Sequence, residues 1–200
     1  MNRSPLAAKL TGKHLILASR SPRRRQLIAE CGLECEIAPD YEVDESYPAD
    51  MEADKVAEHI ASLKSAAYPL PLTEEDILIT ADTVVINDGV ILGKPHSREE
   101  AVAMLRGLSA KRHHVVTGME LRSAERTVRF SVSTEVWFRA MTDDEIAYYV
   151  DTMQPYDKAG AYGIQEWIGL TSVERIEGSY HNVVGLPTES LYVHLIDFLN

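Results

Sequence analysis

Short apolar runs and stretches of helical periodicity alternate along the chain, and this pattern predicts an α/β protein. Residues 14–18 form an apolar run that is typical of a buried strand. The chain then passes through a Ser/Arg turn at residues 19–25 into a segment where apolar residues recur at helical spacing. Ser21 suits the N-cap of that helix, Pro22 its first position and Gly32 its C-terminal cap. A strand therefore leads into a helix through the turn at 19–25.

The remaining chain continues this alternation of strands and helices. Apolar runs predict strands at residues 34–38, 77–79, 84–86, 90–92, 115–121 and 128–138. Apolar helical faces and capping boxes predict helices at residues 52–68, 97–108, 142–150 and 188–199. Residues 154–187 show only weak periodicity. We expect a mixed, partly antiparallel sheet in two lobes, with helices on its faces and a cleft between the lobes.

Composition and charge exclude several classes of function. The 200 residues include 20 Lys and Arg against 31 Asp and Glu, a net charge of −11 at pH 7. Such a charge gives no electrostatic reason to bind nucleic acid, so no nucleic-acid partner is expected. No apolar run is long enough for a spanning helix or a secretory signal, so we expect a cytoplasmic protein without a membrane partner. The two cysteines, spaced C-x3-C, lack a second ligand pair, and no histidine is interpreted as a metal ligand.

The turn at residues 19–25 carries the clearest candidate chemistry. A helix N-terminus offers unpaired N–H groups and a partial positive charge, and both favour an anion. Arg23, Arg24 and Arg25 lie in this first turn, where each cation is unfavourable by roughly a few tenths of a kcal/mol. Two interpretations are open: a solvated basic face paired with surface carboxylates, or a phosphate-binding turn. The position directly after a buried strand favours phosphate binding.

A second candidate site surrounds Asp82, which we expect at the end of the strand that begins at residue 77. A carboxylate there can hold Mg²⁺ or accept a proton from a metal-bound water, or it can simply cap a turn. Lys94 follows the hairpin formed by the strands expected at residues 84–86 and 90–92, and this hairpin can bring Lys94 back near Asp82. The acidic pair Asp44 and Glu45 can complete a metal site with Asp82. Each of these signals is weak alone.

Two further segments have conspicuous patterns. Residues 157–165 contain two glycines that permit close backbone approach, and Gln165 carries an amide able to read the edge of a base. Residues 176–187 are either part of the site or a structural turn before the last helix, and we favour the structural turn.

Together and in this order, these segments resemble the Maf family of nucleotide pyrophosphatases. The matching segments are residues 18–24, 81–85, 93–95, 117–118, 157–165 and 176–187. The resemblance implies a cytoplasmic, homodimeric enzyme that hydrolyses nucleoside triphosphates to monophosphate and pyrophosphate with a divalent metal, Mg²⁺ or Mn²⁺. It also implies a Maf/ITPase-like fold with the active site in the cleft. Residues 1–12 match nothing, so we expect a frayed extension before one catalytic domain at 13–200.

The resemblance also implies a role for each candidate residue. The triphosphate is neutralised by four cations, Arg23, Arg24, Lys64 and Lys94, and Ser19 helps to position a phosphate. Glu45 and Asp82 bind the metal, and Asp82 is the base that activates water. The chain departs from the family pattern at Arg25, whose role is open, and at residues 166–168, where small residues are usual.

Three positions distinguish the branches of the family. The branch that acts on dTTP and UTP carries Arg, Thr and Gln at the positions of Arg23, Thr83 and Gln165, as this chain does. The alternatives are the branch that acts on 7-methyl-GTP and a non-enzymatic nucleotide-binding regulator of cell division. A regulator would not need Asp82 and the acidic pair, so their presence favours an enzyme.

Overall fold

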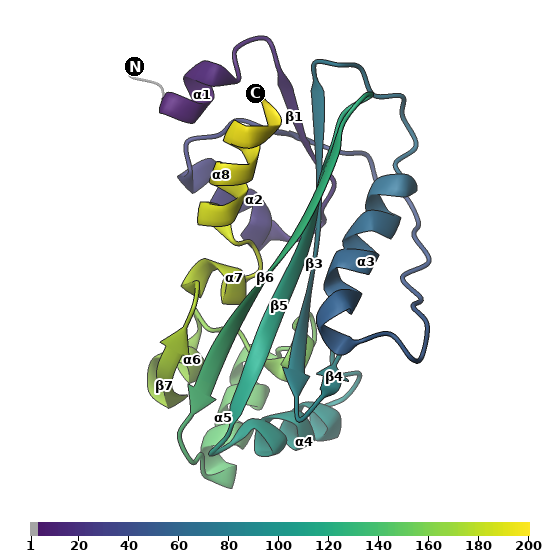
Figure 1. Ribbon diagram of the computed structural model, residues 1–200. Coiled ribbons are helices and arrows are strands. Elements are labelled where there is room, and N and C mark those ends of the chain that lie inside the picture. The colour runs from purple at the N-terminus through teal and green to yellow at the C-terminus, as the bar shows by residue number, and fades with distance from the viewer. Residues whose placement is uncertain (1–3) are drawn as a thin grey trace. The chain divides into compact units, whose positions relative to one another are not determined.

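The computed structural model describes residues 4–200 and contains a mixed sheet (Figure 1). Within these residues seven strands pair in the order β2-β1-β3-β5-β6-β7, and β4 pairs with β3. β1 is parallel to β2 and β3, whereas the β3–β4 and β6–β7 pairs are antiparallel. The expected mixed α/β architecture is thus confirmed. The strands are β1 (His14–Leu17), β2 (Glu36–Ile37), β3 (Asp76–Asn87), β4 (Val90–Leu92), β5 (Arg112–Arg122), β6 (Thr127–Phe138) and β7 (Val173–Glu177).

Three helices begin directly after the capping residues that the sequence predicts, Ser21, Ser97 and Thr142. Ser21 accepts a hydrogen bond from the backbone N–H of Arg24, and Thr142 and Glu145 form a complete capping box. In the part of the chain that the structure describes, no helix is long and apolar enough to cross a membrane. The helices are α1 (Pro5–Lys9), α2 (Pro22–Glu30), α3 (Ala53–Ala66), α4 (Arg98–Leu108), α5 (Asp143–Met153), the 3-10 turn η1 (Ala159–Ala161), α6 (Trp167–Ser172), α7 (Tyr180–Val184) and α8 (Thr188–Phe198).

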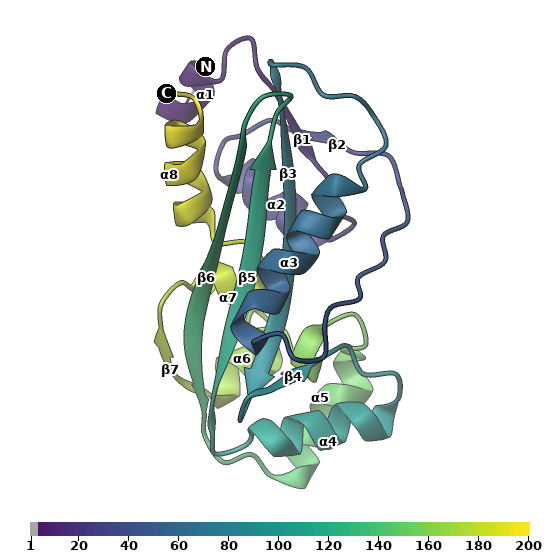
Figure 2. The ribbon, with the colours of Figure 1, turned by 45° about the vertical axis from the view of Figure 1, so that its right-hand side comes forward.

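The chain divides into two compact units. The first unit comprises Met1–Asp82, Thr117–Val132 and Gly185–Asn200. Within it, α3 covers one face of the strands and α2 and α8 cover the other (Figures 1 and 2). Side chains alternate along a strand, so Thr80 and Asp82 of β3 share the face toward α3. The Thr80 hydroxyl accordingly donates to the Ala61 carbonyl of α3 at 2.7 Å.

The second unit comprises Thr83–Val116 and Ser133–Val184. Helix α4 packs against α5 and η1. The core of the second unit is apolar and aromatic, and its buried residues include Val85, Leu105, Val115, Phe138, Tyr149 and Tyr162. Three strands, β3, β5 and β6, each contribute residues to both units.

The strand that carries Asp82 differs from the prediction. Two strands were expected, at residues 77–79 and 84–86, with Asp82 at the end of the first. β3 instead runs without interruption from Asp76 to Asn87, so Asp82 lies inside a strand. Residues 80–83 contain no glycine or proline to break the strand, and their side chains are buried at 80 and 81 and half-buried at 82 and 83.

Other differences lie where the sequence pattern was weak. Residues 154–187 contain α6, β7 and α7, which were not predicted. The last helix has Pro187 at its N-cap, so Thr188 is its first residue and not its cap. Part of the expected N-terminal extension is the helix α1, which packs against α8 with the Leu6 side chain fully buried. Residues 1–3 of that expected extension lie outside the described residues.

Candidate active site

The turn at residues 19–25, which we call the Ser19 turn, is held by side chains that fold back on oxygen atoms. The Ser19 hydroxyl accepts from the backbone N–H of Ser21 at 3.2 Å and from Nη1 of Arg24 at 3.4 Å. Arg25 donates from Nε and Nη2 to the Ser19 carbonyl, at 3.4 and 3.2 Å. These bonds offset the unfavourable position of cations in the first turn of α2. They also give Arg25 a role, because its guanidinium fixes the backbone of the turn.

Arg24 connects the Ser19 turn to the strand that carries Asp82. Its Nη1 donates to the carbonyl of Ala81 at 2.9 Å, and its Nε donates to the carbonyl of Gly185 at 2.8 Å. Burial lowers the pKa of the Arg24 guanidinium, while the nearby Asp82 carboxylate raises that pKa. A guanidinium stays protonated despite such a shift. Arg24 is therefore a fixed positive charge beside Asp82.

Asp82, Lys64 and Glu45 form a second cluster in the same unit, which we call the Asp82 cluster. The Lys64 ammonium contacts Oδ1 of Asp82 at 2.6 Å and Oε1 of Glu45 at 3.2 Å. Asp82 and Lys64 expose only 15% and 17% of their side chains, whereas Glu45 exposes 47%. Two carboxylates thus meet at one ammonium, with an open side at Glu45.

Local geometry explains why Lys64 meets Asp82. Thr80 binds the Ala61 carbonyl, Asp82 is two residues further along β3, and Lys64 is three residues further along α3. Two residues of a strand advance about 6.6 Å, and positions i and i+3 of a helix lie about 5–6 Å apart on one face. Lys64 on α3 and Asp82 on β3 therefore lie at the same level and can contact each other.

The loop that carries Glu45 is fixed to the end of α3. The Tyr41 hydroxyl donates to the carbonyl of Lys64 at 2.8 Å, and its ring packs edge-on against Tyr68. Asp44, expected to join Glu45 in a metal site, instead accepts from the backbone N–H of Ser46 at 3.0 Å. Of the predicted acidic pair, Glu45 is the residue that the structure brings to Asp82.

Gly118 of β5 was part of the family resemblance but had no assigned role. A Cβ atom at this position would lie 2.1 Å from the backbone nitrogen of Glu58 in α3. The backbone of α3 therefore packs directly on β5, and this contact sets the height of Lys64 above the sheet. An isolated glycine within a strand pattern is the sequence signal for such an approach.

The second unit carries Thr83, Lys94 and Gln165. Thr83 is half-buried, and Lys94 and Gln165 are exposed. The backbone N–H of Gly160 donates to the carbonyl of Gly93 at 3.0 Å, so the residue before Lys94 is bound to the segment 157–165. That these three side chains act with Asp82 stays a prediction from the resemblance.

The segment 176–187, expected as a turn before the last helix, contains the end of β7 and the helix α7. The buried Asn182 side chain donates from Nδ2 to the carbonyl of Val115 at 3.0 Å and to the hydroxyl of Thr134 at 2.9 Å. Gly185, at the other end of the segment, supplies the carbonyl that binds Arg24. The segment therefore supports the strands and, within the first unit, the Ser19 turn.

The carboxylates of the Asp82 cluster fit a divalent cation that shares its coordination with a substrate. Among residues 4–200, no three His, Cys, Asp or Glu side chains gather into a metal site of their own. Mg²⁺ is commonly bound through one or two carboxylates together with phosphate oxygens. Asp82 and Glu45, which both contact the Lys64 ammonium, carry carboxylate oxygens of the hard type that such a cation prefers.

Comparison with known proteins gives consistent results. A family model described as "Maf-like protein" matches residues 14–198. A protein of Bacteroides fragilis named dTTP/UTP pyrophosphatase is 47% identical over 95% of this chain and 98% of its own length. A protein of Bacteroides thetaiotaomicron with the same name is 48% identical over 90% of this chain and 94% of its own length. The solved structure of a HAM1 protein from Coxiella burnetii has a TM-score of 0.48 at 13% identity, with 92% of this chain and 99% of that chain covered.

Proposed function

The chain belongs to the Maf family, and on that premise we propose that it hydrolyses dTTP and UTP to the monophosphate and pyrophosphate. Relatives of 47% and 48% identity carry that activity in their names. The observation that supports the proposal most strongly is the junction of the Ser19 turn with the Asp82 cluster. Arg24 bridges the Ser19 hydroxyl and the carbonyl that precedes Asp82. The turn that we propose to bind phosphate thus adjoins the carboxylate proposed to activate water.

Hydrolysis of a phosphoanhydride requires that a water molecule approach an anion, so the negative charge has to be neutralised. In the proposed complex Ser19 positions a phosphate, and Arg23, Arg24, Lys64 and Lys94 neutralise the triphosphate. Arg24 and Lys64 are held in place by hydrogen bonds before the substrate arrives, so little of their side-chain freedom remains to be lost on binding.

Asp82 is the proposed base, and it accepts a proton from the water that attacks the α-phosphorus. Asp82 and Glu45 would hold a divalent cation, Mg²⁺ or Mn²⁺, which when bound neutralises phosphate charge and lowers the pKa of coordinated water. Lys64 keeps the two carboxylates together and limits their mutual repulsion.

Thr83 and Gln165 are proposed to recognise the base. Thymine and uracil are small bases that present carbonyls and an N3–H, and the Thr83 hydroxyl and the Gln165 amide can meet these groups. A base that leaves the amide unpaired is disfavoured by roughly 1–3 kcal/mol. We attribute the preference for dTTP and UTP over purine triphosphates to the small size of these bases together with this pairing.

We further propose that the protein is a cytoplasmic homodimer and that residues 13–200 act as one catalytic domain. Support for the single domain comes from β3, β5 and β6, since each strand runs through both compact units. Sedimentation equilibrium tests the dimer.

Product analysis tests the proposed activity. The purified protein is incubated with Mg²⁺ and a panel of triphosphates, and the products are identified by phosphorus NMR. We expect pyrophosphate and monophosphate from dTTP and UTP, and no turnover by Asp82→Asn that folds as the wild type does. Near-normal rates for Asp82→Asn would show that the base is wrongly assigned. Nucleotide binding without pyrophosphate release would support a regulator instead.

A further inference from the structure

Gln165 lies in a tight turn whose neighbours are fixed. The backbone N–H of Glu166 donates to the carbonyl of Gly163 at 3.0 Å, which closes the turn around Gln165. Ile164, directly before Gln165, is 4% exposed and belongs to the core of the second unit. Gln165 itself is exposed. The turn therefore presents one amide side chain from a backbone that is held by a hydrogen bond and by a buried neighbour.

The Glu166 side chain is the centre of this arrangement. Its carboxylate accepts from the ammonium of Lys158 at 3.0 Å and from the hydroxyl of Tyr149. The same hydroxyl accepts from the backbone N–H of Gly163 at 3.0 Å. Tyr149 is fully buried and Lys158 is 9% exposed, so these bonds are largely shielded from water. Glu166 and Tyr149 thus join both ends of the turn that contains Gln165.

Gly163 provides the space that the carboxylate needs. A Cβ atom on Gly163 would lie 2.9 Å from Cδ of Glu166 and 3.1 Å from each of its carboxylate oxygens. Residues 166–168 are the place where this chain departs from the small residues usual in the family. At the first of these positions the chain carries the charged Glu166, which has hydrogen-bond partners in Tyr149 and Lys158 and space beside Gly163.

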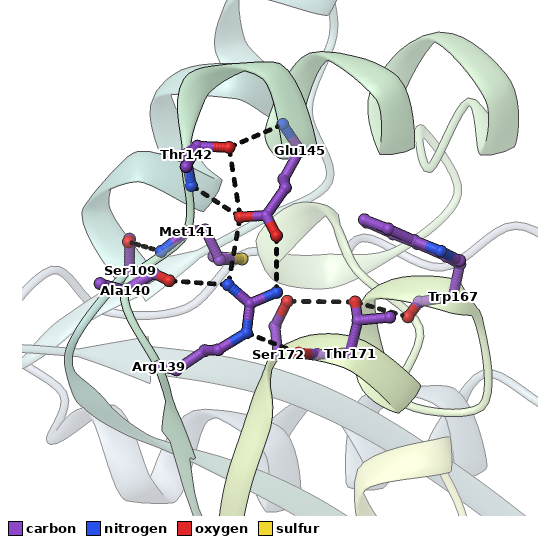
Figure 3. Close-up of polar contacts among 9 residues, drawn as sticks. All are labelled: Ser109, Arg139, Ala140, Met141, Thr142, Glu145, Trp167, Thr171 and Ser172. Carbon is purple, nitrogen blue, oxygen red and sulfur yellow. Dashed lines mark hydrogen bonds and ion pairs between the residues drawn. The ribbon is translucent and has the colours of Figure 1, made fainter.

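The helix that follows the turn is fixed separately at its other end. Figure 3 shows Arg139 between α5 and α6, where it donates to the carbonyl of Thr171 at 2.6 Å and to the carboxylate of Glu145 at 2.7 Å. Thr171 also donates to the carbonyl of Trp167 at 2.9 Å. Arg139 and Glu145 hold the end of α6 but do not contact the turn at Gln165 through these bonds. They offer a matched control for Glu166.

We propose that Glu166 is a positioning residue that holds Gln165 ready to read the base. The inference rests on the proposed function, because it assigns Glu166 to the base-reading part of that site. A side chain that reads a base from a fixed backbone loses less conformational freedom on binding than one from a mobile loop. A displacement of about 1 Å at such a side chain can change rates by about 100-fold. Glu166 therefore acts on the choice of base and not on the chemistry at phosphorus.

The test compares Glu166→Ala, Gln165→Ala and the double variant in the full-length protein. The readout is the ratio of kcat/KM for dTTP to that for dATP, with kcat and KM recorded separately. We expect Glu166→Ala to lower this ratio roughly 3- to 10-fold through KM for dTTP. Because Glu166 acts through Gln165, the double variant should be no less selective than Gln165→Ala. Glu166→Gln keeps an oxygen for Tyr149 and should restore most of the selectivity.

Two controls separate this role from general destabilisation. Glu145→Gln weakens the other anchor of α6 and should leave the ratio unchanged. Tyr149→Phe, which keeps the ring but removes the shared hydroxyl, should reproduce the loss and serves if Glu166→Ala does not fold. Unchanged selectivity in Glu166→Ala or Tyr149→Phe, or additive losses in the double variant, would overturn the inference. A wild type that releases no pyrophosphate from dTTP or UTP would overturn the proposed function and the inference with it.

Discussion

Substitution of Gly118 by alanine should separate the Asp82 cluster without touching any of its side chains. The added Cβ would lie 2.1 Å from the nitrogen of Glu58 and 2.3 Å from two other backbone atoms of α3. Contacts tighter than 3.4 Å already require a neighbour to move, so α3 has to withdraw by about 1.3 Å (3.4 − 2.1). The obstructing atoms belong to a helix backbone, so no side-chain rotation can relieve the clash.

The magnitude follows from this geometry. Overpacking costs typically about 1–3 kcal/mol, and a backbone obstacle puts Gly118→Ala near the upper end, about 3 kcal/mol. For a chain of this length that corresponds to a fall in Tm of roughly 6–12 °C. Withdrawal of α3 carries Lys64 away from Asp82, whose contact is 2.6 Å. A displacement of about 1 Å lowers kcat/KM by roughly 100-fold.

Thermal unfolding by circular dichroism and pyrophosphate release from dTTP measure the two effects. Gly107→Ala is the matched control, since its Cβ would meet only Asn87 Nδ2, at the ordinary distance of 4.0 Å. Gly107 lies inside α4, where alanine should be neutral or stabilising by up to about 1 kcal/mol. A Gly118→Ala protein with the Tm and kcat/KM of the wild type would refute direct packing of α3 on β5.

Three further predictions concern single side chains. Lys64→Met removes the ammonium but keeps an aliphatic chain of similar length, which leaves the Asp82 carboxylate without its 2.6 Å partner. We expect the free energy of unfolding, measured with urea, to fall by about 1–3 kcal/mol and the rate of pyrophosphate release to fall at least 10-fold. Wild-type values for both would show that the Lys64–Asp82 contact is not important. Burial lowers the pKa of His113 from 6.5 to about 4, so its protonation is resisted only in the folded state. The free energy of unfolding should be highest above pH 6.5 and fall by about 3 kcal/mol as the pH is lowered to 4. Urea unfolding of His113→Gln should show a weaker dependence of this free energy on pH. The same pH dependence in His113→Gln and the wild type would exclude His113 as the cause. Gln165→Ala should lower the preference for dTTP over dATP by roughly 10-fold while kcat for dTTP changes less, and an unchanged preference would remove Gln165 from base recognition.

The local features of the Ser19 turn could be predicted from the sequence because each depends on near neighbours. Ser21 caps α2 through a residue three positions away, and Pro22 suits a first turn wherever the helix packs. The continuity of β3 was less predictable. Residues 80–83 are polar enough to suggest a strand end, and only the neighbouring strands and α3 make a continuous strand favourable there.

The Asp82 cluster depends on contacts between distant parts of the chain. Lys64 was expected near the end of its helix, but its meeting with Asp82 requires that α3 dock on β5 at Gly118. The same applies to Glu166, whose partner Tyr149 lies in α5 and whose partner Lys158 directly precedes η1. Spacing along a sequence does not encode such pairings, and residues 154–187 also lack the periodicity that would have predicted α6, β7 and α7.

Competition between nucleotides tests the central claim most directly. dTTP, UTP, dATP and 7-methyl-GTP are mixed at equal concentration with Mg²⁺ and the unmodified protein, and the disappearance of each is followed by chromatography. Relative rates in one mixture report ratios of kcat/KM, which measure discrimination in the transition state. We expect dTTP and UTP to be consumed first, with equimolar release of their monophosphates and pyrophosphate. Faster consumption of 7-methyl-GTP or dATP than of dTTP and UTP would contradict the central claim.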